Sequence, residues 1–148
     1  METTMKPKVI VGLGSCGIAA GASKTYNKIE ALMTAGLLDC ELSKTSCVGM
    51  CYKEPLVEVH DQNGWVMYGD MTEDKVEEIL KRHIIDNEIV VDMAVRSELH
   101  KGTEDAFFEG HVRIALRNCG HINPESLEEA EKHYAYKDIR IIFESSIE

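Results

Sequence analysis

Three cysteines have the residue type and the spacing to hold a metal. Cys16 stands in a glycine-rich stretch, and Cys47 and Cys51 are separated by three residues further along the chain. Thiolates bind iron–sulfur clusters in sets of four, so the pattern predicts a cluster site that lacks one ligand. Zinc at the same thiols, or a loop with incidental thiols, are the competing interpretations. The fourth ligand therefore decides the chemistry.

The flanking sequence predicts that the three sulfurs converge. Cys16 follows the apolar run 8–14, and Cys47 follows the alternating segment 38–44. If these segments are neighbouring parallel strands, the loops after them leave the sheet at the same end. Small residues in both loops let backbone N–H groups approach a cluster's sulfurs. These residues are Gly17, Ala19, Ala20, Gly21 and Gly49.

The other two cysteines are poorer candidates for ligands. Cys40 alternates with Leu38 and Leu42 and shares their face of a predicted strand, so we expect it in the core as a small hydrophobic residue. Cys119 is remote in sequence, and packing is the favoured role. The 6 histidines show no spacing typical of a metal site.

The glycines before Cys16 match a dinucleotide-binding fingerprint. Gly12, Gly14 and Gly17 have the spacing G-x-G-x-x-G between a predicted strand and a predicted helix. That fingerprint also needs an acidic residue at the end of the second strand, whereas this strand ends at Thr45 and Ser46. The favoured interpretation is a tight strand-to-helix turn that carries Cys16.

The order of the predicted elements indicates an α/β fold. We expect strands at 8–14 and 38–44, a hairpin of 55–60 with 65–68 around Asn63-Gly64, and helices at 23–35 and 72–82. This order predicts a mixed four-stranded sheet with flanking helices, as in thioredoxin-like folds. We assign it to residues 1–86. Residues 87–148 form a C-terminal extension with no obvious core, a short strand at 89–91 and a helix that starts at Asn123-Pro124.

Composition narrows the class of protein. With 148 residues, 44% of them hydrophobic, the chain is typical of one soluble domain with a tail. The net charge of -10 argues against nucleic acid as a partner. The apolar run at Val9–Val11 is too short for a signal or membrane segment, so we expect a cytoplasmic protein without membrane insertion. In a reducing compartment the 5 cysteines favour metal or redox chemistry over disulfides.

At this point the chain resembles a known family. The motifs at 11–22 and 44–59, VGLGSCGIAAGA and KTSCVGMCYKEPLVEV, are similar to the thioredoxin-like 2Fe-2S ferredoxin domain. That domain opens the flavoprotein subunits of NADH-dependent hydrogenases, including electron-bifurcating ones, and of relatives of the complex I NADH-binding subunit. The resemblance covers residues 8 to about 85, and 104–129 are similar to the segment that leads into the flavin and NADH domain of those subunits.

The resemblance implies an electron-transfer module of an NADH-dependent oxidoreductase complex, not catalytic alone. It implies a 2Fe-2S cluster with Cys16, Cys47 and Cys51 as ligands, and flavoprotein and iron–sulfur subunits as partners, with a homodimer as a further expectation. The chain ends before any flavin or NADH motif, so we expect neither FMN nor NAD on it.

The chain departs from the family at one ligand. Cluster-bearing members have a cysteine five residues before the one that matches Cys16, and that position is Val11 here. Cys40, a histidine or an external ligand would have to complete the set. The alternative is a thioredoxin-like docking module that lost its cluster. A thiol redox protein that uses Cys47 and Cys51 is a weaker alternative, because the C-x-x-C spacing of thioredoxins is absent.

Overall fold

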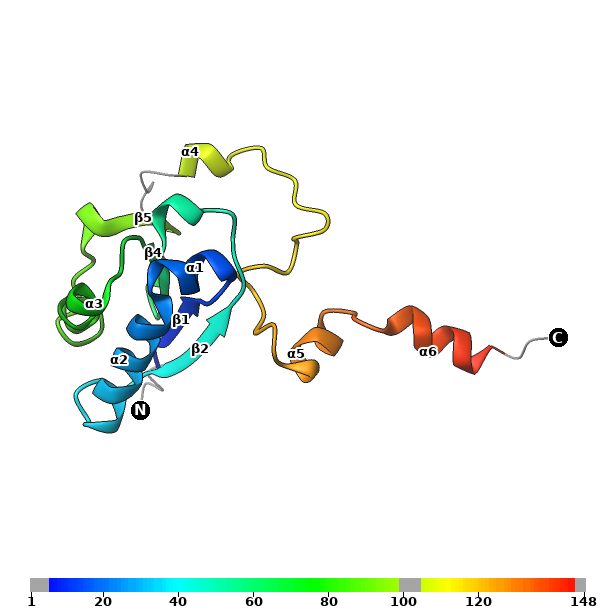
Figure 1. Cartoon of the computed structure of the whole chain (residues 1–148), viewed down its shortest axis with the longest axis horizontal. Coiled ribbons are helices and arrows are strands. Elements are labelled where there is room, and N and C mark those ends of the chain that lie inside the picture. The colour runs from blue at the N-terminus through cyan, green and yellow to red at the C-terminus, as the bar shows by residue number, and fades with distance from the viewer. Residues whose placement is uncertain (1–5, 99–104, 146–148) are drawn as a thin grey trace.

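The computed structural model describes residues 6–98 and 105–145, and its centre is a mixed sheet (Figure 1). The strands are β1 (Lys8–Gly12), β2 (Glu41–Thr45), β3 (Val57–Asp61), β4 (Gly64–Tyr68) and β5 (Ala94–Ser97). The α-helices are α1 (Ser15–Ala20), α2 (Ala22–Thr34), α3 (Glu73–Leu80), α4 (Asp105–Phe108), α5 (Leu127–Lys132) and α6 (Lys137–Glu144). The strand order is β2-β1-β3-β4-β5, with β1 and β2 parallel and the other pairs antiparallel. The α/β class with a mixed sheet is thus as predicted.

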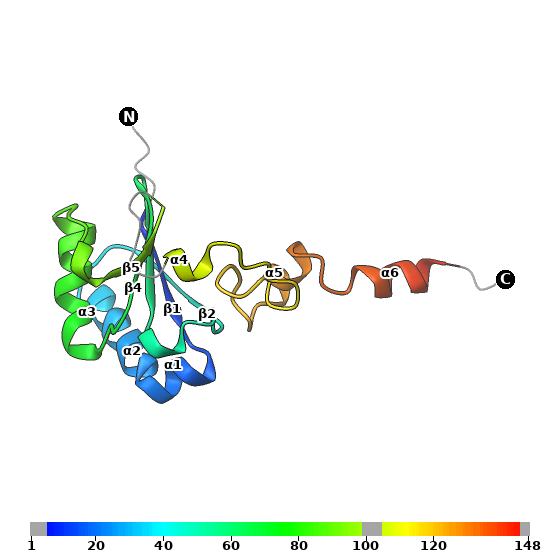
Figure 2. The same ribbon diagram turned by 90° about the horizontal axis from the view of Figure 1, so that it is seen from above.

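The two faces of the sheet have separate apolar clusters, because side chains alternate along each strand. Val9, Val11 and Val59 pack with α2 and α3 in the larger cluster. Met67 and Val95 belong to the smaller cluster on the other face. Figure 2 shows α2 and α3 along one side of the sheet and α4 on the other. The side chain of Val11, fully buried, therefore points into the helix-covered core.

The sheet has five strands, so the prediction of four is corrected. β5 pairs antiparallel with β4 and lies beyond residue 86, which carries the sheet into the segment assigned to the extension. The apolar run 89–91 is not a strand. Val90 is buried and its N–H donates to the Tyr68 hydroxyl at 3.4 Å, which leads the chain into a 3₁₀ turn at Val91–Met93 before β5 starts. The division of the chain at residue 86 stays a prediction.

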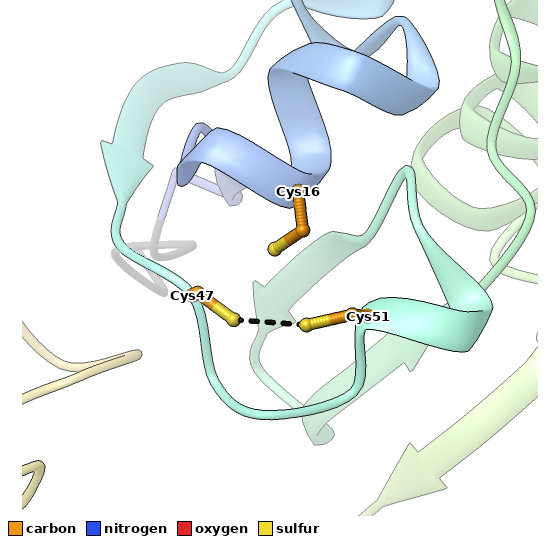
Figure 3. A group of neighbouring side chains, drawn as sticks. All are labelled: Cys16, Cys47 and Cys51. Carbon is orange, nitrogen blue, oxygen red and sulfur yellow. Dashed lines mark hydrogen bonds between the residues drawn. The ribbon is translucent and has the colours of Figure 1, made fainter.

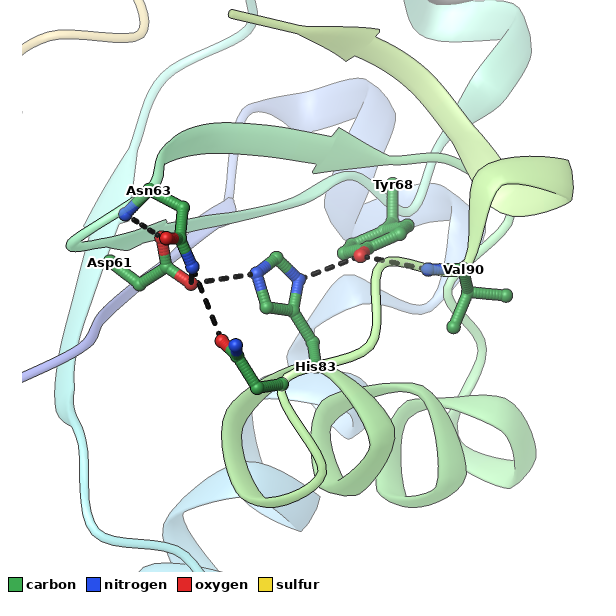
Figure 4. Close-up of polar contacts among 6 residues, drawn as sticks. Asp61, Asn63, Tyr68, His83 and Val90 are labelled. Atoms are coloured by element: carbon green, nitrogen blue, oxygen red, sulfur yellow. Dashed lines mark hydrogen bonds and ion pairs between the residues drawn. The ribbon is translucent and has the colours of Figure 1, made fainter. Parts of the chain in front are cut away.

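A buried chain of polar groups joins the hairpin to the turn after α3 (Figure 4). His83 lies in a π-helical turn, Lys81–Ile85, and its Nδ1 is 2.6 Å from the Tyr68 hydroxyl oxygen. Its Nε2 is 3.4 Å from Asp61 Oδ2. These partners assign the imidazole proton to Nε2, with the Tyr68 O–H donating to Nδ1. Burial lowers the pKa of His83, and the Asp61 charge opposes this. The ring is therefore neutral and fully bonded.

In the C-terminal segment 105–145, α4 lies beside β5, and α5 and α6 lead away from the sheet (Figure 1). None of its residues with a described side chain is buried, whereas Val90, Ala94 and Val95 of the predicted extension 87–148 belong to the core clusters. It joins the end of β2 through Thr45, whose hydroxyl donates to the Ile122 carbonyl and accepts from the Gly120 N–H, both at 3.1 Å. Lys44 also forms an ion pair with Glu125.

The helix expected at Asn123-Pro124 starts later than predicted. α5 begins at Leu127, and its cap is Ser126, whose side chain accepts from the Glu129 N–H at 3.2 Å. Asn123 instead accepts from the Glu125 N–H at 3.0 Å, a local turn that competes with helix initiation.

No helix among the residues described is long and apolar enough to span a membrane.

Candidate metal centre

Cys16, Cys47 and Cys51 meet at one end of the sheet (Figure 3). Cys16 lies in the first turn of α1, just after β1, and Cys47 lies in the loop after β2. Because β1 and β2 are parallel, the two loops leave the sheet at the same end, as predicted. Cys51 begins a 3₁₀ turn, Cys51–Lys53, which returns the chain towards β3.

The three sulfurs have the proximity of a metal site. Their Sγ atoms all lie within 4.8 Å of one another, the one such group of histidine, cysteine or carboxylate side chains found in residues 6–98 and 105–145. Cys47 Sγ and Cys51 Sγ are 3.5 Å apart, and the Gly49 N–H donates to Cys47 Sγ at 3.3 Å. A backbone donor on a sulfur is the kind of contact that tunes a bound cluster.

The local electrostatics keep Cys16 protonated in the metal-free protein. Burial, followed by hydrogen bonds to Cys47 and Cys51 and by the nearby charge of Glu54, raises the pKa of Cys16 to about 12. Three crowded sulfurs disfavour another negative charge, whereas a cation among them stabilises thiolates. Metal binding must therefore displace a proton from Cys16.

Glu54 is a member of the site that the sequence prediction did not include. The residue is buried, and its Oε1 accepts from the Cys16 thiol at 3.5 Å while its Oε2 accepts from the Leu56 N–H at 2.9 Å. Burial raises the pKa of this carboxyl, and the two hydrogen bonds oppose the rise. Its place in the sequence, three positions after Cys51, does not predict the contact with Cys16, 38 residues away.

The glycines of the fingerprint have packing reasons here. A Cβ on Gly14 would lie 2.8 Å from both Cβ and the backbone N of Cys47, and a Cβ on Gly17 would lie 2.3 Å from the Gly12 carbonyl oxygen. Distances this short are not tolerated, so Gly14 is needed to bring the start of α1 against the Cys47 loop, and Gly17 to bring α1 against the end of β1. This agrees with a tight turn that carries Cys16.

The remaining thiols lie away from the site. Cys40 is 1% exposed and belongs to the core cluster beside α2, as its alternation with Leu38 predicted. Burial, first of all, raises its thiol pKa. Cys119 lines a hollow of about 210 Å³ with Trp65 and Arg113 and is not part of the cysteine group. All five cysteines are free.

Part of the sequence is similar to a known protein family. Residues 13–83 match the model of the thioredoxin-like [2Fe-2S] ferredoxin family. This part of the chain is therefore similar to that family. The matched residues contain Cys16, Cys47 and Cys51, the three thiols that converge in the structure. Ferredoxins carry electrons, and the similarity therefore indicates electron transfer.

Two relatives share parts of the sequence. The chain is 41% identical over 49 residues to a 2Fe-2S ferredoxin of Clostridium pasteurianum, an alignment that covers 33% of this chain and 46% of that protein. It is 29% identical over 87 residues to the NADP-reducing hydrogenase subunit HndB of Solidesulfovibrio fructosivorans, covering 57% of this chain and 69% of the subunit. The chain thus matches less than half the length of the clostridial ferredoxin.

Solved structures support the fold. A thioredoxin-like [2Fe-2S] ferredoxin from Aquifex aeolicus superposes with a TM-score of 0.55 at 19% identity, over 66% of this chain and 96% of the ferredoxin. A second structure, of the wild-type protein, gives a TM-score of 0.52 at 22% identity, over 61% of this chain and 96% of that one. At such identities the likeness concerns the fold alone.

Proposed function

We propose that this chain is an electron-transfer subunit of a cytoplasmic NADH-dependent oxidoreductase complex and works through a [2Fe-2S] cluster. The observation that carries the proposal is the convergence of Cys16, Cys47 and Cys51, with all Sγ atoms within 4.8 Å of one another, in a part of the chain that is similar to a ferredoxin family. The partners proposed are flavoprotein and iron–sulfur subunits, supported by the likeness to a hydrogenase subunit.

The residues present suit an iron–sulfur group. Thiolates are the ligands that such clusters prefer, and the Gly49 N–H already points to Cys47 Sγ. When bound, the cluster supplies one-electron redox chemistry. The protein would contribute three thiolates, hold their loops together through the glycine contacts of α1, and supply backbone hydrogen bonds to sulfur.

The experiment is metal analysis of protein purified without oxygen. We expect iron and sulfide in near-equal amounts and an EPR signal after reduction, and we expect Cys47→Ser to remove both. Cys119→Ser is the matched control, because that thiol lies outside the site, and it should retain the iron of the unaltered chain. A preparation without iron that cannot be reconstituted contradicts the proposal.

A docking module without a cluster is the second candidate. It is favoured by Val11, whose buried side chain belongs to the core cluster and supplies no ligand. On this hypothesis, serine variants of the three cysteines retain partner binding. Capture of flavoprotein subunits from extract of the native host by the whole chain, unaltered or with Cys16→Ser, separates the two. Equal capture together with an iron-free chain favours docking.

A further inference from the structure

The carboxylate of Glu54 lies beside the end of β1 and accepts from the Cys16 thiol. Val11 points into the helix-covered core, so no side chain at that position reaches the cysteines without a change in the strand. The next residue, Gly12, faces the other side. A Cβ built on Gly12 would have Glu54 Oε2 at 3.4 Å and Glu54 Oε1 at 3.5 Å as its nearest neighbours. The space open to a side chain at the end of β1 thus holds the Glu54 carboxylate.

Two pairs among the four groups have the separation of two ligands on one metal. A metal–thiolate bond is about 2.3 Å and a metal–carboxylate bond about 2.0–2.2 Å, which puts two ligand atoms on one tetrahedral metal roughly 3.5–3.8 Å apart. Cys16 Sγ and Glu54 Oε1 are 3.5 Å apart. Cys47 Sγ and Cys51 Sγ are also 3.5 Å apart. A cluster with two irons needs two such pairs.

The hydrogen bonds of Glu54 also favour a role as a ligand. Glu54 Oε2 keeps the Leu56 N–H under all conditions, but Oε1 has the Cys16 thiol as its donor. Cysteine binds metal as a thiolate, so that donor is lost when Cys16 becomes a ligand. A buried carboxylate oxygen without a partner is costly, and a bound iron would satisfy it.

We propose that Glu54 is the fourth ligand of the cluster, with Oε1 binding the iron that Cys16 binds; this rests on the proposed function. The Cys16 proton leaves to solvent, and the carboxylate binds in its ionised form. Three thiolates and one carboxylate carry the same total charge as four thiolates. The chain therefore compensates for Val11 with an oxygen ligand from a different loop.

The test is Mössbauer spectroscopy of the whole chain reconstituted with ⁵⁷Fe. In the oxidised, unaltered protein we expect two ferric sites with different isomer shifts, because one iron has an oxygen ligand. Glu54→Cys should make the sites more alike, and Glu54→Gln should weaken iron retention about 10- to 100-fold. Glu58→Gln is the matched control: Glu58 is a partly buried carboxylate beside the same end of β3 and should leave the spectrum unchanged.

The outcomes separate this proposal from the proposed function. A cluster with two equivalent sites overturns the role of Glu54 and leaves electron transfer intact, whereas a chain that takes up no cluster overturns both. Unchanged iron content and spectrum in a folded Glu54→Gln variant overturn the role of Glu54. Thermal unfolding of the metal-free variants shows whether each of them folds. If Glu54→Gln does not fold, ENDOR on reduced unaltered protein labelled with ¹³C at glutamate carboxylates decides, because absence of a carbon coupling overturns the proposal.

Discussion

Strand β3 has a carboxylate near each end, Glu54 buried and Asp61 partly buried, and the two are bonded in different ways. Asp61, the last residue of β3, accepts from the Asn63 N–H at 2.7 Å and faces His83 Nε2 at 3.4 Å. Glu54, before the strand, accepts from one backbone N–H and from a thiol. All partners of Asp61 are permanent parts of the fold, whereas one partner of Glu54 is a candidate metal ligand. Asp61 thus has a structural role, whereas Glu54 can lose a donor when Cys16 binds metal.

The largest expected effect comes from removing His83, which contacts Asp61 at the C-terminal end of β3. His83→Ala removes a buried ring, and with it the acceptor of the Tyr68 O–H and one donor to Asp61, so we expect the free energy of unfolding to fall by about 3–5 kcal/mol. Urea unfolding of metal-free protein measures it. A loss below about 1 kcal/mol would mean that the chain of polar groups does not stabilise the fold.

The two carboxylates can then be compared directly by amide substitution. Asp61→Asn places an NH₂ group among donors and should cost about 1–3 kcal/mol of stability. Glu54→Gln retains an acceptor for the Leu56 N–H and should change the metal-free protein by less than about 1 kcal/mol. Urea unfolding of both variants gives the comparison. Equal losses would remove the distinction between the two ends.

The cysteine site can be disturbed by a substitution at a residue that is not a proposed ligand. Gly14→Ala places a Cβ 2.8 Å from the backbone N of Cys47, which displaces that loop, so we expect cluster loss to a chelator to become about 10-fold faster. The exposed neighbour provides the control, Ser15→Ala, which should behave as the unaltered chain. Equal rates for the two variants would contradict the packing argument.

The smallest expected effect is a pH dependence of the free energy of unfolding that comes from His83. Burial holds the pKa of His83 below its ordinary value of 6.5 in the folded chain, so the unfolded chain takes up the proton first as pH falls. The contribution of the neutral ring to stability is therefore present above pH 6.5 and is lost as pH falls from there towards the folded pKa. Urea unfolding between about pH 8 and pH 5 should show this slope, and His83→Gln should flatten it. An identical slope in both proteins assigns it elsewhere.

Local patterns predicted the elements that depend on local chemistry. The hairpin forms around Gly64, whose φ is 119° and which alone of Asn63-Gly64 has a positive φ. The alternation of Cys40 with Leu38 predicted its burial, and the parallel pairing of β1 with β2 followed from the crossover helix. These features need only the period of side chains and the conformational range of glycine.

Features that depend on distant partners were missed. β5 forms because β4 offers a free edge, and Val90 is drawn to the Tyr68 hydroxyl 22 residues away, which moved the strand from the expected run. Glu54 becomes part of the site through Cys16, 38 residues away, and its own neighbours in the sequence give no indication of that contact. Ser126, with a glutamate three residues later, has the pattern of a helix N-cap. The competing pattern Asn123-Pro124 was chosen in its place.

The two hydrogen bonds of Thr45 have a consequence for measurement. Thr45 stands two residues before Cys47, and its hydroxyl accepts from the Gly120 N–H. A shift of the Cys47 loop would therefore reach a peptide group 75 residues away without passing through the core. Hydrogen exchange at the Gly120 amide would then report the state of the cysteine loop from a part of the chain that contains none of its thiols.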